Sequence, residues 1–223
     1  MQKIILTGAT GLVGSRFVEL YGSEFEISNL DLATGVDITD ETQVDSFIKD
    51  HPANTLIHLA AFTDTTKAEA EQGNKEGICY RVNVLGTKNI AKACRKYNLH
   101  LIHVSTDFVF DGTKTTPYSE NDPVSPLGWY GTTKAIAESV VAEIGGSYAI
   151  ARLSYPYRAN FDLKPDLIVK IRQGLVANTL PPQFSDTEIT PTFVDDIAAS
   201  FATLAKKQLT GTCLLYTSPS PRD

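Results

Sequence analysis

The sequence predicts an α/β fold built on a doubly wound parallel sheet, followed by a partial substrate-binding region. Two observations carry this prediction. A glycine-rich turn follows a short apolar run at the N-terminus, and apolar runs then alternate with segments of helical spacing as far as residue 154. Repeated strand–helix units form parallel sheets with right-handed crossovers, and such sheets bind ligands at the carboxyl ends of their strands.

The first strand and turn match the pattern of a dinucleotide-binding loop. The apolar run at residues 4–6 predicts a buried strand, and residues 15–21 have helical spacing. Between them, Gly8 permits a tight turn, Gly11 lets the backbone approach a pyrophosphate, and Gly14 allows close packing of helix on strand. The helix N-terminus offers N–H groups to the phosphates. An ordinary glycine-rich turn is the alternative interpretation.

The second predicted strand, at residues 25–31, ends in an acidic residue. Asp31 stands roughly 20 residues after the glycine turn, where a carboxylate can accept hydrogen bonds from the adenosine ribose. No Arg or Lys follows it directly to bind a 2′-phosphate, so the sequence favours NAD(H), with NADP(H) as the alternative. The other interpretation of Asp31 is a solvent-exposed loop residue.

The remaining elements continue the alternation. Residues 55–61 form the next apolar run, which ends in small residues that let a cofactor lie close. Residues 82–97 carry apolar side chains at positions i, i+3, i+4 and i+7, which predicts a helix. A strand at 99–105, a helix at 132–143 and a strand at 147–154 complete the predicted sheet.

Tyr130 and Lys134 stand four residues apart, so a helix would place both side chains on one face. A cation beside a phenol favours the phenolate and lowers its pKa from about 10. A tyrosine of this kind can exchange a proton in carbonyl–alcohol redox chemistry. Thr106 ends a predicted strand and is expected at the same sheet edge as Ala60 and Ala61. An exposed helix pair is the alternative for Tyr130 and Lys134.

The composition fits a soluble enzyme of the cytoplasm. The 223 residues carry a net charge of −6 and have no basic run, so no nucleic-acid partner is expected. No apolar stretch approaches ~20 residues, so no membrane segment is expected. The three cysteines are scattered and the four histidines do not cluster, which predicts a reducing compartment and no metal site.

Together these motifs resemble the extended short-chain dehydrogenases/reductases. Within that superfamily the pattern is most similar to the dTDP-4-dehydrorhamnose reductase family, whose members reduce the 4-keto group of a nucleotide-linked deoxysugar. The resemblance covers roughly residues 2–212. It rests on the segments Thr7 to Gly14, Leu59 to Ala61, Val82 to Thr87, Ser105 to Gly112, Tyr130 to Lys134 and Thr190 to Ile197.

The resemblance implies three catalytic residues. Tyr130 is expected to protonate the new alkoxide as NADH delivers hydride, and Thr106 to hydrogen-bond the substrate carbonyl. Lys134 is expected to bind the nicotinamide ribose and to hold down the pKa of Tyr130. These roles make chemical sense, because hydride addition develops negative charge on an oxygen that preorganised donors stabilise.

The resemblance also implies a set of cofactor contacts. Asp37 and Ile38 match the segment that lies along the adenine, and Asn83 matches a residue that supports the geometry of the site. The implied cofactor-binding residues are Gly8, Thr10, Gly11, Leu12, Val13, Asp31, Asp37, Ile38, Leu59, Ala60, Ala61, Tyr130 and Lys134.

Phe108 favours a reductase over two related activities. Nucleotide-sugar 4,6-dehydratases typically place Glu at this position, and a phenylalanine cannot perform their acid/base step. Epimerases usually have small residues across this stretch. Asp107 is interpreted as a supporting or merely structural carboxylate. An epimerase or dehydratase, and a non-catalytic dinucleotide-binding regulatory subunit, remain the alternatives.

The chain is expected to contain a dinucleotide-binding domain at 1–160 and a partial substrate-binding region at 161–212, interleaved with the last sheet elements. The expected partner is a small nucleotide sugar. The polar residues 63–81 are expected to determine which sugar is bound. The candidate assembly is a homodimer. A strand is expected near Gly211. Residues 213–223, which follow it, are predicted to lack regular structure and to be non-native, the natural protein being longer. A shortened chain would expose apolar surface.

Overall fold

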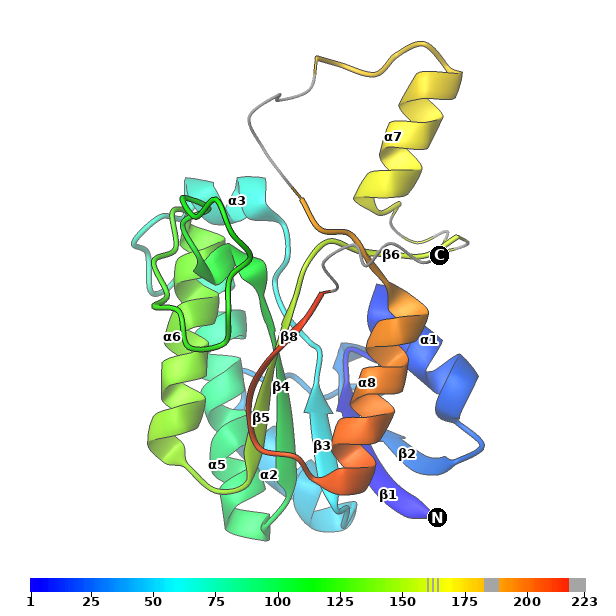
Figure 1. The fold of residues 1–223 in the computed structure, drawn as a ribbon. Helices are drawn as coiled ribbons and strands as arrows, with labels where there is room; N and C mark the ends of the chain where they lie inside the picture. Colours follow the sequence, from blue (N-terminus) through cyan, green and yellow to red (C-terminus); the bar gives the residue numbers. More distant parts are fainter. Residues whose placement is uncertain (160, 162, 164, 183–188, 217–223) are drawn as a thin grey trace.

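The protein is built around a six-stranded parallel sheet in the order β2-β1-β3-β4-β5-β8 (Figure 1). The computed structural model describes residues 1–223 except 160, 162, 164, 183–188 and 217–223. The strand order reverses between β1 and β3, where a doubly wound sheet opens its ligand crevice. The strands of this sheet are β1 (Gln2–Thr7), β2 (Phe25–Asn29), β3 (Thr55–His58), β4 (His100–Thr106), β5 (Tyr148–Leu153) and β8 (Gly211–Leu215).

Helices cover both faces of the sheet (Figure 1), which confirms the predicted Rossmann-type fold. α1 and α8 pack on one face, and α2, α5 and α6 pack on the other. The helices are α1 (Leu12–Tyr21), α2 (Glu41–Asp50), α3 (Thr65–Ala70), α4 (Ile78–Tyr80), α5 (Thr87–Tyr97), α6 (Trp129–Ile144), α7 (Leu167–Val176) and α8 (Val194–Lys207). Three short helical turns are η1 (Leu32–Thr34), η2 (Arg81–Gly86) and η3 (Asp107–Val109).

Two hydrophobic clusters, one on each face, hold the helices to the strands. On one face, the fully buried rings of Phe17 in α1 and Phe201 in α8 belong to the same cluster as Ile102 in β4. On the other face, Ile90 of α5 belongs to the same cluster as Leu101 of β4. The neighbouring residues Leu101 and Ile102 enter opposite clusters because successive side chains of a strand point to opposite faces.

The five strands predicted from apolar runs are all present, whereas several helices differ from expectation, among them α3, α7 and α8, which were not predicted. The helix predicted to begin at Val82 begins at Ile78 and passes through the π-helical turn η2 into α5. A π turn interrupts the 3.6-residue spacing, so the apolar pattern is readable only after it. The helix α2 was not predicted, although Asp40 caps its N-terminus and Val44 and Ile48 stand at helical spacing.

The C-terminal strand corrects the predicted boundary of the unstructured tail. Residues 213–215 were expected to lack regular structure, but they belong to β8, where Cys213 pairs with Ala151 and Leu215 with Leu153 of β5. Both Cys213 and Leu215 pack against the cluster on the α8 side. Burial against α8 therefore orders a segment whose own sequence has no clear period. Residues 217–223 of the predicted tail lie outside the described residues.

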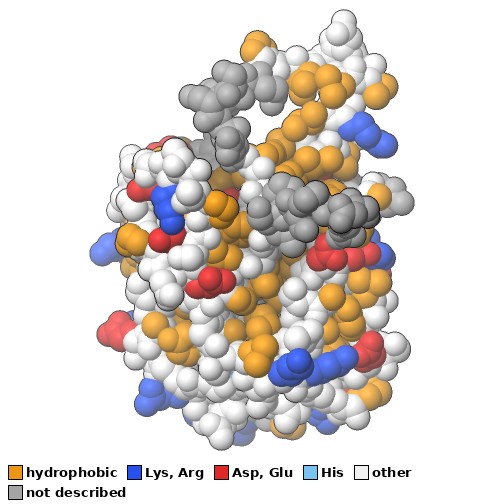
Figure 2. Space-filling view, in the orientation of Figure 1, with side chains coloured by type: hydrophobic (Ala, Val, Ile, Leu, Met, Phe, Trp, Pro, Cys, Tyr) orange, Lys and Arg blue, Asp and Glu red, His pale blue; other side chains and the backbone are white. Residues whose placement is uncertain are grey.

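A second, two-stranded sheet formed by β6 (Pro156–Tyr157) and β7 (Thr192–Phe193) leads towards α7. α7 has no buried residue, and apolar side chains are visible at this end of the molecule in Figure 2. This region belongs to the predicted substrate-binding part, of which residues 162, 164 and 183–188 lie outside the described residues. In the part of the chain that the structure describes, no helix has the length and apolar character needed to span a membrane.

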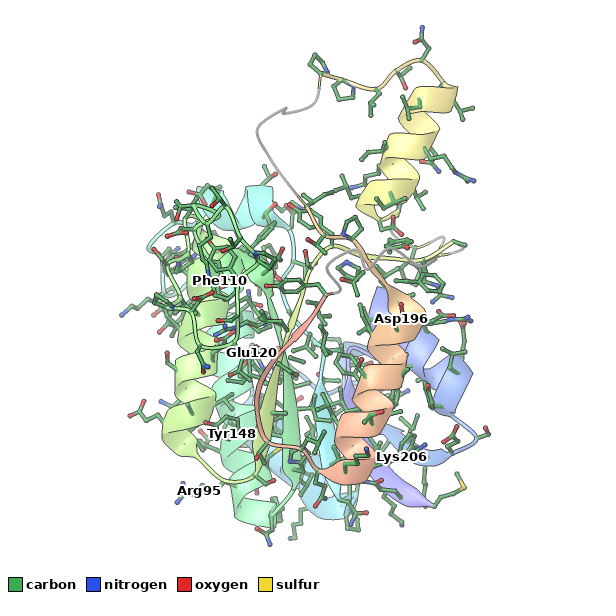
Figure 3. All side chains as sticks on the ribbon, in the orientation of Figure 1. Arg95, Phe110, Glu120, Tyr148, Asp196 and Lys206 are labelled. Carbon is green, nitrogen blue, oxygen red and sulfur yellow. The ribbon has the colours of Figure 1, made fainter. Side chains whose placement is uncertain are left out.

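Ion pairs attach α8 to the first strand–helix unit. The Arg16 guanidinium of α1 makes two hydrogen bonds of 2.7 Å to the Asp195 carboxylate at the start of α8. Lys206, labelled near the other end of α8 in Figure 3, lies 2.6 Å from a carboxylate oxygen of Glu24. Such partly exposed pairs contribute about 1 kcal/mol or less each, so the apolar contacts of α8 carry most of its stabilisation.

We expect Phe201→Ala to lower the free energy of unfolding by about 3–5 kcal/mol, because the substitution leaves a cavity at the centre of the α8 cluster. Urea denaturation followed by circular dichroism measures the change. Thr203→Ala, at an exposed position of the same helix, is the control and should change stability by less than ~0.5 kcal/mol. Equal effects of the two substitutions would contradict the assignment of Phe201 to the core.

Candidate functional site

The turn from β1 into α1 leaves no room for side chains at Gly8, which follows β1, or at Gly14, in the first turn of α1. Gly8 has a φ of +69°, and a Cβ there would lie 3.0 Å from the backbone nitrogen of Ala60. At Gly14, a Cβ would lie 2.2 Å from the Gly8 carbonyl oxygen. The geometry thus matches a tight turn at Gly8 and close packing of helix on strand at Gly14, as the sequence predicts.

The N-terminus of α1 faces this loop without a side-chain cap. Gly11 is the residue before the helix and has no side chain to bond the first N–H groups. Thr10 is exposed beside it, Leu12 is half-buried, and the Val13 side chain packs into the core. Val13 can therefore contribute only its backbone to a ligand, whereas the helix end offers N–H donors and a partial positive charge.

A buried hydroxyl joins the ends of β1 and β3. Thr7 Oγ1 accepts hydrogen bonds of 3.0 Å from the backbone N–H groups of Leu59 and Ala60. The same oxygen lies 2.8 Å from Nδ1 of His58, whose Nε2 lies 3.0 Å from Thr87 Oγ1. These bonds hold the exit of β3 against the glycine loop, at the point where the strand order reverses.

Counting protons assigns the tautomer of His58. Two N–H donors occupy the lone pairs of Thr7 Oγ1, so its own proton is donated to Nδ1 of His58. Nε2 of His58 then carries the ring proton and donates to Thr87, which in turn donates to the Asn83 carbonyl at 2.7 Å. Burial, with a smaller effect of Lys134, lowers the pKa of His58 to about 3, so the imidazole is neutral.

Asp31 lies just beyond β2 with one carboxylate oxygen bonded and the other free for a ligand. Its Oδ1 accepts a hydrogen bond of 3.0 Å from the backbone N–H of Ala33. Its Oδ2 is buried and has no partner among the described residues. Asp31 is only 8% exposed, unlike a solvent-exposed loop residue. A buried acceptor without a partner requires a donor from outside the chain, such as a ligand hydroxyl.

The segment predicted to lie along the adenine is held against η2 and α5. Oδ1 of Asp37 accepts bonds of 2.8 and 2.9 Å from the backbone and hydroxyl of Thr39. Ile38 is buried beside Gly86, where a Cβ would lie 2.7 Å from the Ile38 side chain. Asn89 Nδ2 donates to the Ile38 carbonyl at 3.0 Å. One oxygen of Asp37 is therefore committed to the local turn.

Tyr130 and Thr106 meet at the carboxyl end of β4. Tyr130 lies in the first turn of α6, and the Thr106 side chain lies close enough to its phenol to oppose the rise of its pKa. Its ring meets the Phe108 ring edge-on, with centroids 5.8 Å apart and planes at 84°. The structure thus brings two of the three predicted catalytic residues into contact.

Lys134 lies one turn further along α6 and is 3% exposed. Its ammonium donates a hydrogen bond of 2.7 Å to the Val104 carbonyl. Burial lowers the pKa of Lys134 to about 8, against the opposing effects of Glu138 and Cys79. At neutral pH the side chain is therefore still mostly protonated, although it is much closer to losing its proton than an exposed lysine.

The prediction that Lys134 lowers the pKa of Tyr130 is wrong for this structure. Burial raises the pKa of Tyr130, the bond with Thr106 opposes the rise, and the charges of Asp107 and Cys79 add to it. The Lys134 ammonium instead faces the Val104 carbonyl. A site that excludes water disfavours both the phenolate and the ammonium, so the two pKa values shift in opposite directions.

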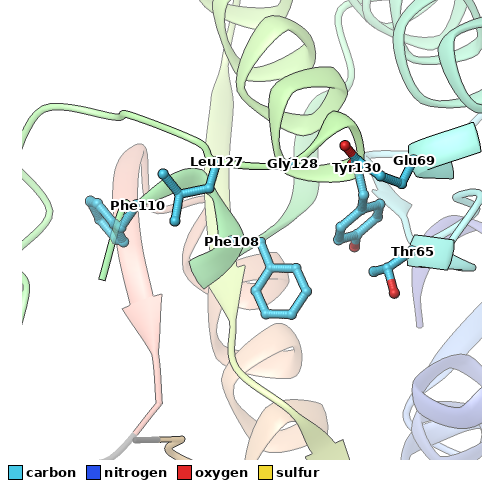
Figure 4. A pocket seen from close by; sticks show the side chains of 8 residues that line it. Thr65, Glu69, Phe108, Phe110, Leu127, Gly128 and Tyr130 are labelled. Atoms are coloured by element: carbon cyan, nitrogen blue, oxygen red, sulfur yellow. The ribbon is translucent and has the colours of Figure 1, made fainter. Parts of the chain in front are cut away.

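A cavity of about 250 Å³ lies beside the Tyr130 ring (Figure 4). Its polar side comes from α3, within the residues 63–81 that were predicted to shape specificity. Glu69 of α3 also accepts a hydrogen bond of 3.0 Å from the backbone N–H of Trp129, which fixes the start of α6. The apolar residues that line the cavity are Phe108, Phe110 and Leu127, and the polar ones are Thr65, Glu69 and Tyr130.

Asn83 connects the exit of β3 to the start of α6. Its Oδ1 accepts a hydrogen bond of 2.8 Å from the backbone N–H of Phe62, and its Nδ2 lies 3.0 Å from Thr133 Oγ1. Thr133 in turn donates to the Tyr130 carbonyl at 2.8 Å. This chain of bonds fixes Tyr130 relative to the glycine loop, which is the supporting position that the resemblance implied for Asn83.

Arg158 contacts the glycine loop and was not predicted. It follows β6, and its Nη1 donates to Ser15 Oγ at 3.0 Å, 143 residues away in the chain. The same nitrogen lies 3.5 Å from the Leu12 carbonyl oxygen, and its other amino group bonds Glu19 at 3.0 Å. A single arginine in a loop has no periodicity or motif, so the sequence contains no signal for this contact.

The residues present fit a dinucleotide. The glycine loop permits close approach of a pyrophosphate, the uncapped end of α1 can bind its charge, and the unpartnered Asp31 Oδ2 can accept from a ribose hydroxyl. Tyr130 and Lys134 lie at the carboxyl end of the same sheet. Across the described ranges there is no group of three His, Cys, Asp or Glu residues placed to hold a metal ion.

This fold and site define a Rossmann-type protein of the extended short-chain dehydrogenase/reductase class. A family model described as the RmlD substrate binding domain matches residues 1–216, so the chain belongs to this family. The dTDP-4-dehydrorhamnose reductase of Aggregatibacter actinomycetemcomitans is 32% identical over 223 residues, a match that covers 97% of this chain and 71% of that protein.

Solved structures agree with this assignment. The crystal structure of a dTDP-4-dehydrorhamnose reductase from Clostridium acetobutylicum is similar with a TM-score of 0.84 and 28% identity, covering 97% of this chain and 74% of that one. The Bacillus anthracis reductase, crystallised in complex with NADP, has a TM-score of 0.81 and 28% identity, covering 97% and 75%. Structural neighbours therefore bind NADP and, in more distant cases, NAD.

We expect Lys134→Met to stabilise the protein at pH 7 and to lose this advantage as the pH rises. The pKa of Lys134 is about 8 in the folded protein, against an ordinary value of 10.5. This difference means that the charged lysine destabilises the folded protein by about 3 kcal/mol. The destabilisation is complete below pH 8, decreases between pH 8 and 10.5, and is absent above 10.5. Loss of the hydrogen bond to the Val104 carbonyl offsets about 1 kcal/mol of the stabilisation expected for Lys134→Met. Urea denaturation at pH 7 and 9.5 measures the effect.

Lys92→Met is the control for this experiment, because Lys92 is an exposed lysine paired with Glu41. Its effect on stability should be small at both pH values. A stabilisation by Lys134→Met that is equal or larger at pH 9.5 would contradict the lowered pKa of Lys134.

Proposed function

We propose that the protein is an NAD(P)H-dependent reductase of a nucleotide-linked 4-keto-6-deoxysugar. One observation carries the proposal: Tyr130 borders a cavity, Thr106 at the carboxyl end of β4 lies close enough to its phenol to affect its pKa, and the buried Lys134 is one helical turn away. The membership of the RmlD family and the similarity to named dTDP-4-dehydrorhamnose reductases support it. The candidate substrate is a dTDP-linked 4-keto-6-deoxysugar.

In this mechanism the bound dinucleotide supplies the hydride that reduces the keto carbon. Tyr130 donates a proton to the carbonyl oxygen as negative charge develops there. Its raised pKa keeps the phenol protonated at neutral pH. Thr106 provides a second hydrogen bond to the same oxygen, and Lys134 binds the nicotinamide ribose.

The position of Phe108 supports a reductase over a dehydratase. Phe108 lines the cavity at the position where a dehydratase would need a carboxylic acid, and its ring packs against Tyr130. Elimination of water from the sugar requires a second proton-transfer group beside the reacting carbons, and a phenyl ring offers none. The polar residues Thr65 and Glu69 remain as hydrogen-bonding partners for sugar hydroxyl groups.

The proposal is tested by titrating the purified chain with NADH and NADPH and then adding a dTDP-4-keto-6-deoxysugar, while nucleotide fluorescence is recorded. Binding followed by oxidation of the nucleotide is the expected result. A folded chain that binds neither nucleotide would refute the cofactor assignment. A chain that binds a nucleotide but oxidises none in the presence of several 4-keto sugars would act as the non-catalytic dinucleotide-binding subunit instead.

We expect Tyr130→Phe to lower kcat by roughly 10²–10⁴-fold, because it removes the proton donor, while NADH still binds with nearly unchanged affinity. Stopped-flow absorbance of NADH measures the rate. Tyr148→Phe, at the start of β5 and labelled well below the cavity residue Phe110 in Figure 3, is the matched control and should keep the wild-type rate. A Tyr130→Phe variant with more than about a tenth of the wild-type rate would exclude Tyr130 as the acid.

We expect Asp31→Ala to weaken NADH binding by roughly 10–100-fold, the effect of removing hydrogen bonds to a charged acceptor. The affinity for NADPH should fall less than the affinity for NADH, because the substitution also removes repulsion between the Asp31 carboxylate and the 2′-phosphate. Fluorescence titration gives both dissociation constants. Asp40→Ala, which removes the capping carboxylate of α2, is the control for a general effect on stability. An unchanged ratio of NADH to NADPH affinity would contradict the ribose contact.

A further inference from the structure

Arg158 joins the first turn of α1 to the start of α7. Its Nη1 donates to Ser15 Oγ at 3.0 Å and lies 3.5 Å from the Leu12 carbonyl oxygen. Its backbone N–H donates to Oδ2 of Asp166 at 3.0 Å. Asp166 is the residue before α7, and its Oδ1 accepts from the Val169 N–H at 2.9 Å. The Arg158 side chain is therefore anchored on α1, and its backbone holds the cap of α7.

The contacts of Arg158 on α1 lie in the turn that follows the glycine loop. The Ser15 backbone N–H donates to the Gly11 carbonyl at 3.0 Å, so Ser15 is the residue that closes this first turn. Leu12 is the first residue of the helix. The free N–H groups of the same turn are the ones proposed to bind the pyrophosphate of the dinucleotide. Arg158 and the nucleotide therefore both require the first turn of α1 to be closed.

Glu19, one turn further along α1, holds the other amino group of Arg158. Nη2 of Arg158 donates to both carboxylate oxygens of Glu19, at 3.0 and 3.2 Å. Arg16 also bonds Glu19, and it makes two hydrogen bonds to Asp195. The two arginines and the two carboxylates balance in charge, and the Arg158 side chain is only 11% exposed. The guanidinium is therefore fixed by hydrogen bonds on both sides, for which its planar shape is suited.

α7 has no buried face to hold it in place. None of its residues is buried, and the helix stands beyond the carboxyl edge of the sheet, where the proposed site lies (Figure 1). Most of the stability of a helix in a protein comes from packing of an apolar face, so the position of α7 depends on contacts at its ends. At its N-terminus this contact is the Asp166 carboxylate, which the Arg158 N–H holds.

We propose that Arg158 is a positioning residue that couples the occupied dinucleotide loop to α7, so that a bound nucleotide orders the start of the substrate-binding region. Helix ends fray, and a ligand that binds only the closed first turn of α1 stabilises that turn. The closed turn keeps Ser15 and the Leu12 carbonyl in place for Arg158, which in turn holds Asp166 at the cap of α7.

The coupling works in both directions. A coupling free energy between two sites is reciprocal, so an ordered α7 strengthens nucleotide binding by the factor by which the nucleotide orders α7. The proposal rests on the dinucleotide binding of the proposed function. It does not require Arg158 to touch the nucleotide or the sugar.

Hydrogen–deuterium exchange of the whole chain, measured by mass spectrometry with and without saturating NADH, tests the coupling. In the wild type, NADH should slow exchange roughly fivefold or more both at residues 8–21 and at residues 167–176. In Arg158→Met, NADH should still slow exchange at residues 8–21, which shows that the loop is occupied, but no longer at residues 167–176. A merely structural role of Arg158 would speed the exchange of α7 equally with and without NADH.

Two further variants separate hydrogen bonding from charge. Arg158→Lys keeps the positive charge but lacks the planar fork that bonds Ser15 and Glu19 together, so it should lose most of the effect of NADH on α7. Arg172→Met is the matched control, because Arg172 is an exposed arginine of α7 itself, and it should keep the wild-type response. In a fluorescence titration, the dissociation constant of NADH should rise several-fold in Arg158→Met and stay unchanged in Arg172→Met.

The inference is overturned if the NADH-dependent slowing at residues 167–176 persists in Arg158→Met or returns in full in Arg158→Lys. It is also overturned if this slowing is absent from a wild type whose residues 8–21 respond to NADH, or if Arg158→Met binds NADH as tightly as the wild type. A folded wild type that does not bind NADH, with no response in either segment, would refute the proposed dinucleotide site itself and with it the basis of the coupling.

Discussion

A single buried hydroxyl, that of Thr7, holds the ligand edge of the sheet together. It joins the ends of β1 and β3 by accepting from two backbone N–H groups, and it fixes the neutral tautomer of His58. His58 extends the chain of bonds to Thr87 and to the Asn83 carbonyl. The Asn83 side chain continues it to Thr133 and hence to the helix that carries Tyr130. This network connects the exit of β3, beside the glycine loop, to the start of α6, where Tyr130 lies.

Burial gives the site its chemistry as well as its geometry. Exclusion of water moves the pKa of Lys134 down and those of Tyr130 and Asp107 up, so each group lies nearer to its neutral form than it would in water. At neutral pH Lys134 nevertheless stays mostly protonated, whereas the Tyr130 phenol is neutral.

Much of this arrangement is predictable from sequence because its signals are local. The glycine spacing before α1, the apolar runs of β1 to β5 and the spacing of Tyr130 and Lys134 each fall within a few residues. No local signal predicts the start of the helix at Ile78 or the extent of strand β8. The helix start depends on the π turn η2, and β8 depends on pairing with β5, more than 50 residues earlier in the chain. The contact of Arg158 with Ser15 likewise has no sequence pattern.

The sequence by itself determined the class of fold, its first five strands and which residues reach the carboxyl edge of the sheet, because apolar periodicity and glycine placement are local properties of the sequence. Only the tertiary structure decided how Lys134 and Tyr130 titrate, since a pKa depends on burial and on partners such as the Val104 carbonyl and Thr106. The bonds of Asp107 to Thr106 and Ser154 arise in the same way, because β4 and β5 become neighbours only when the sheet has formed.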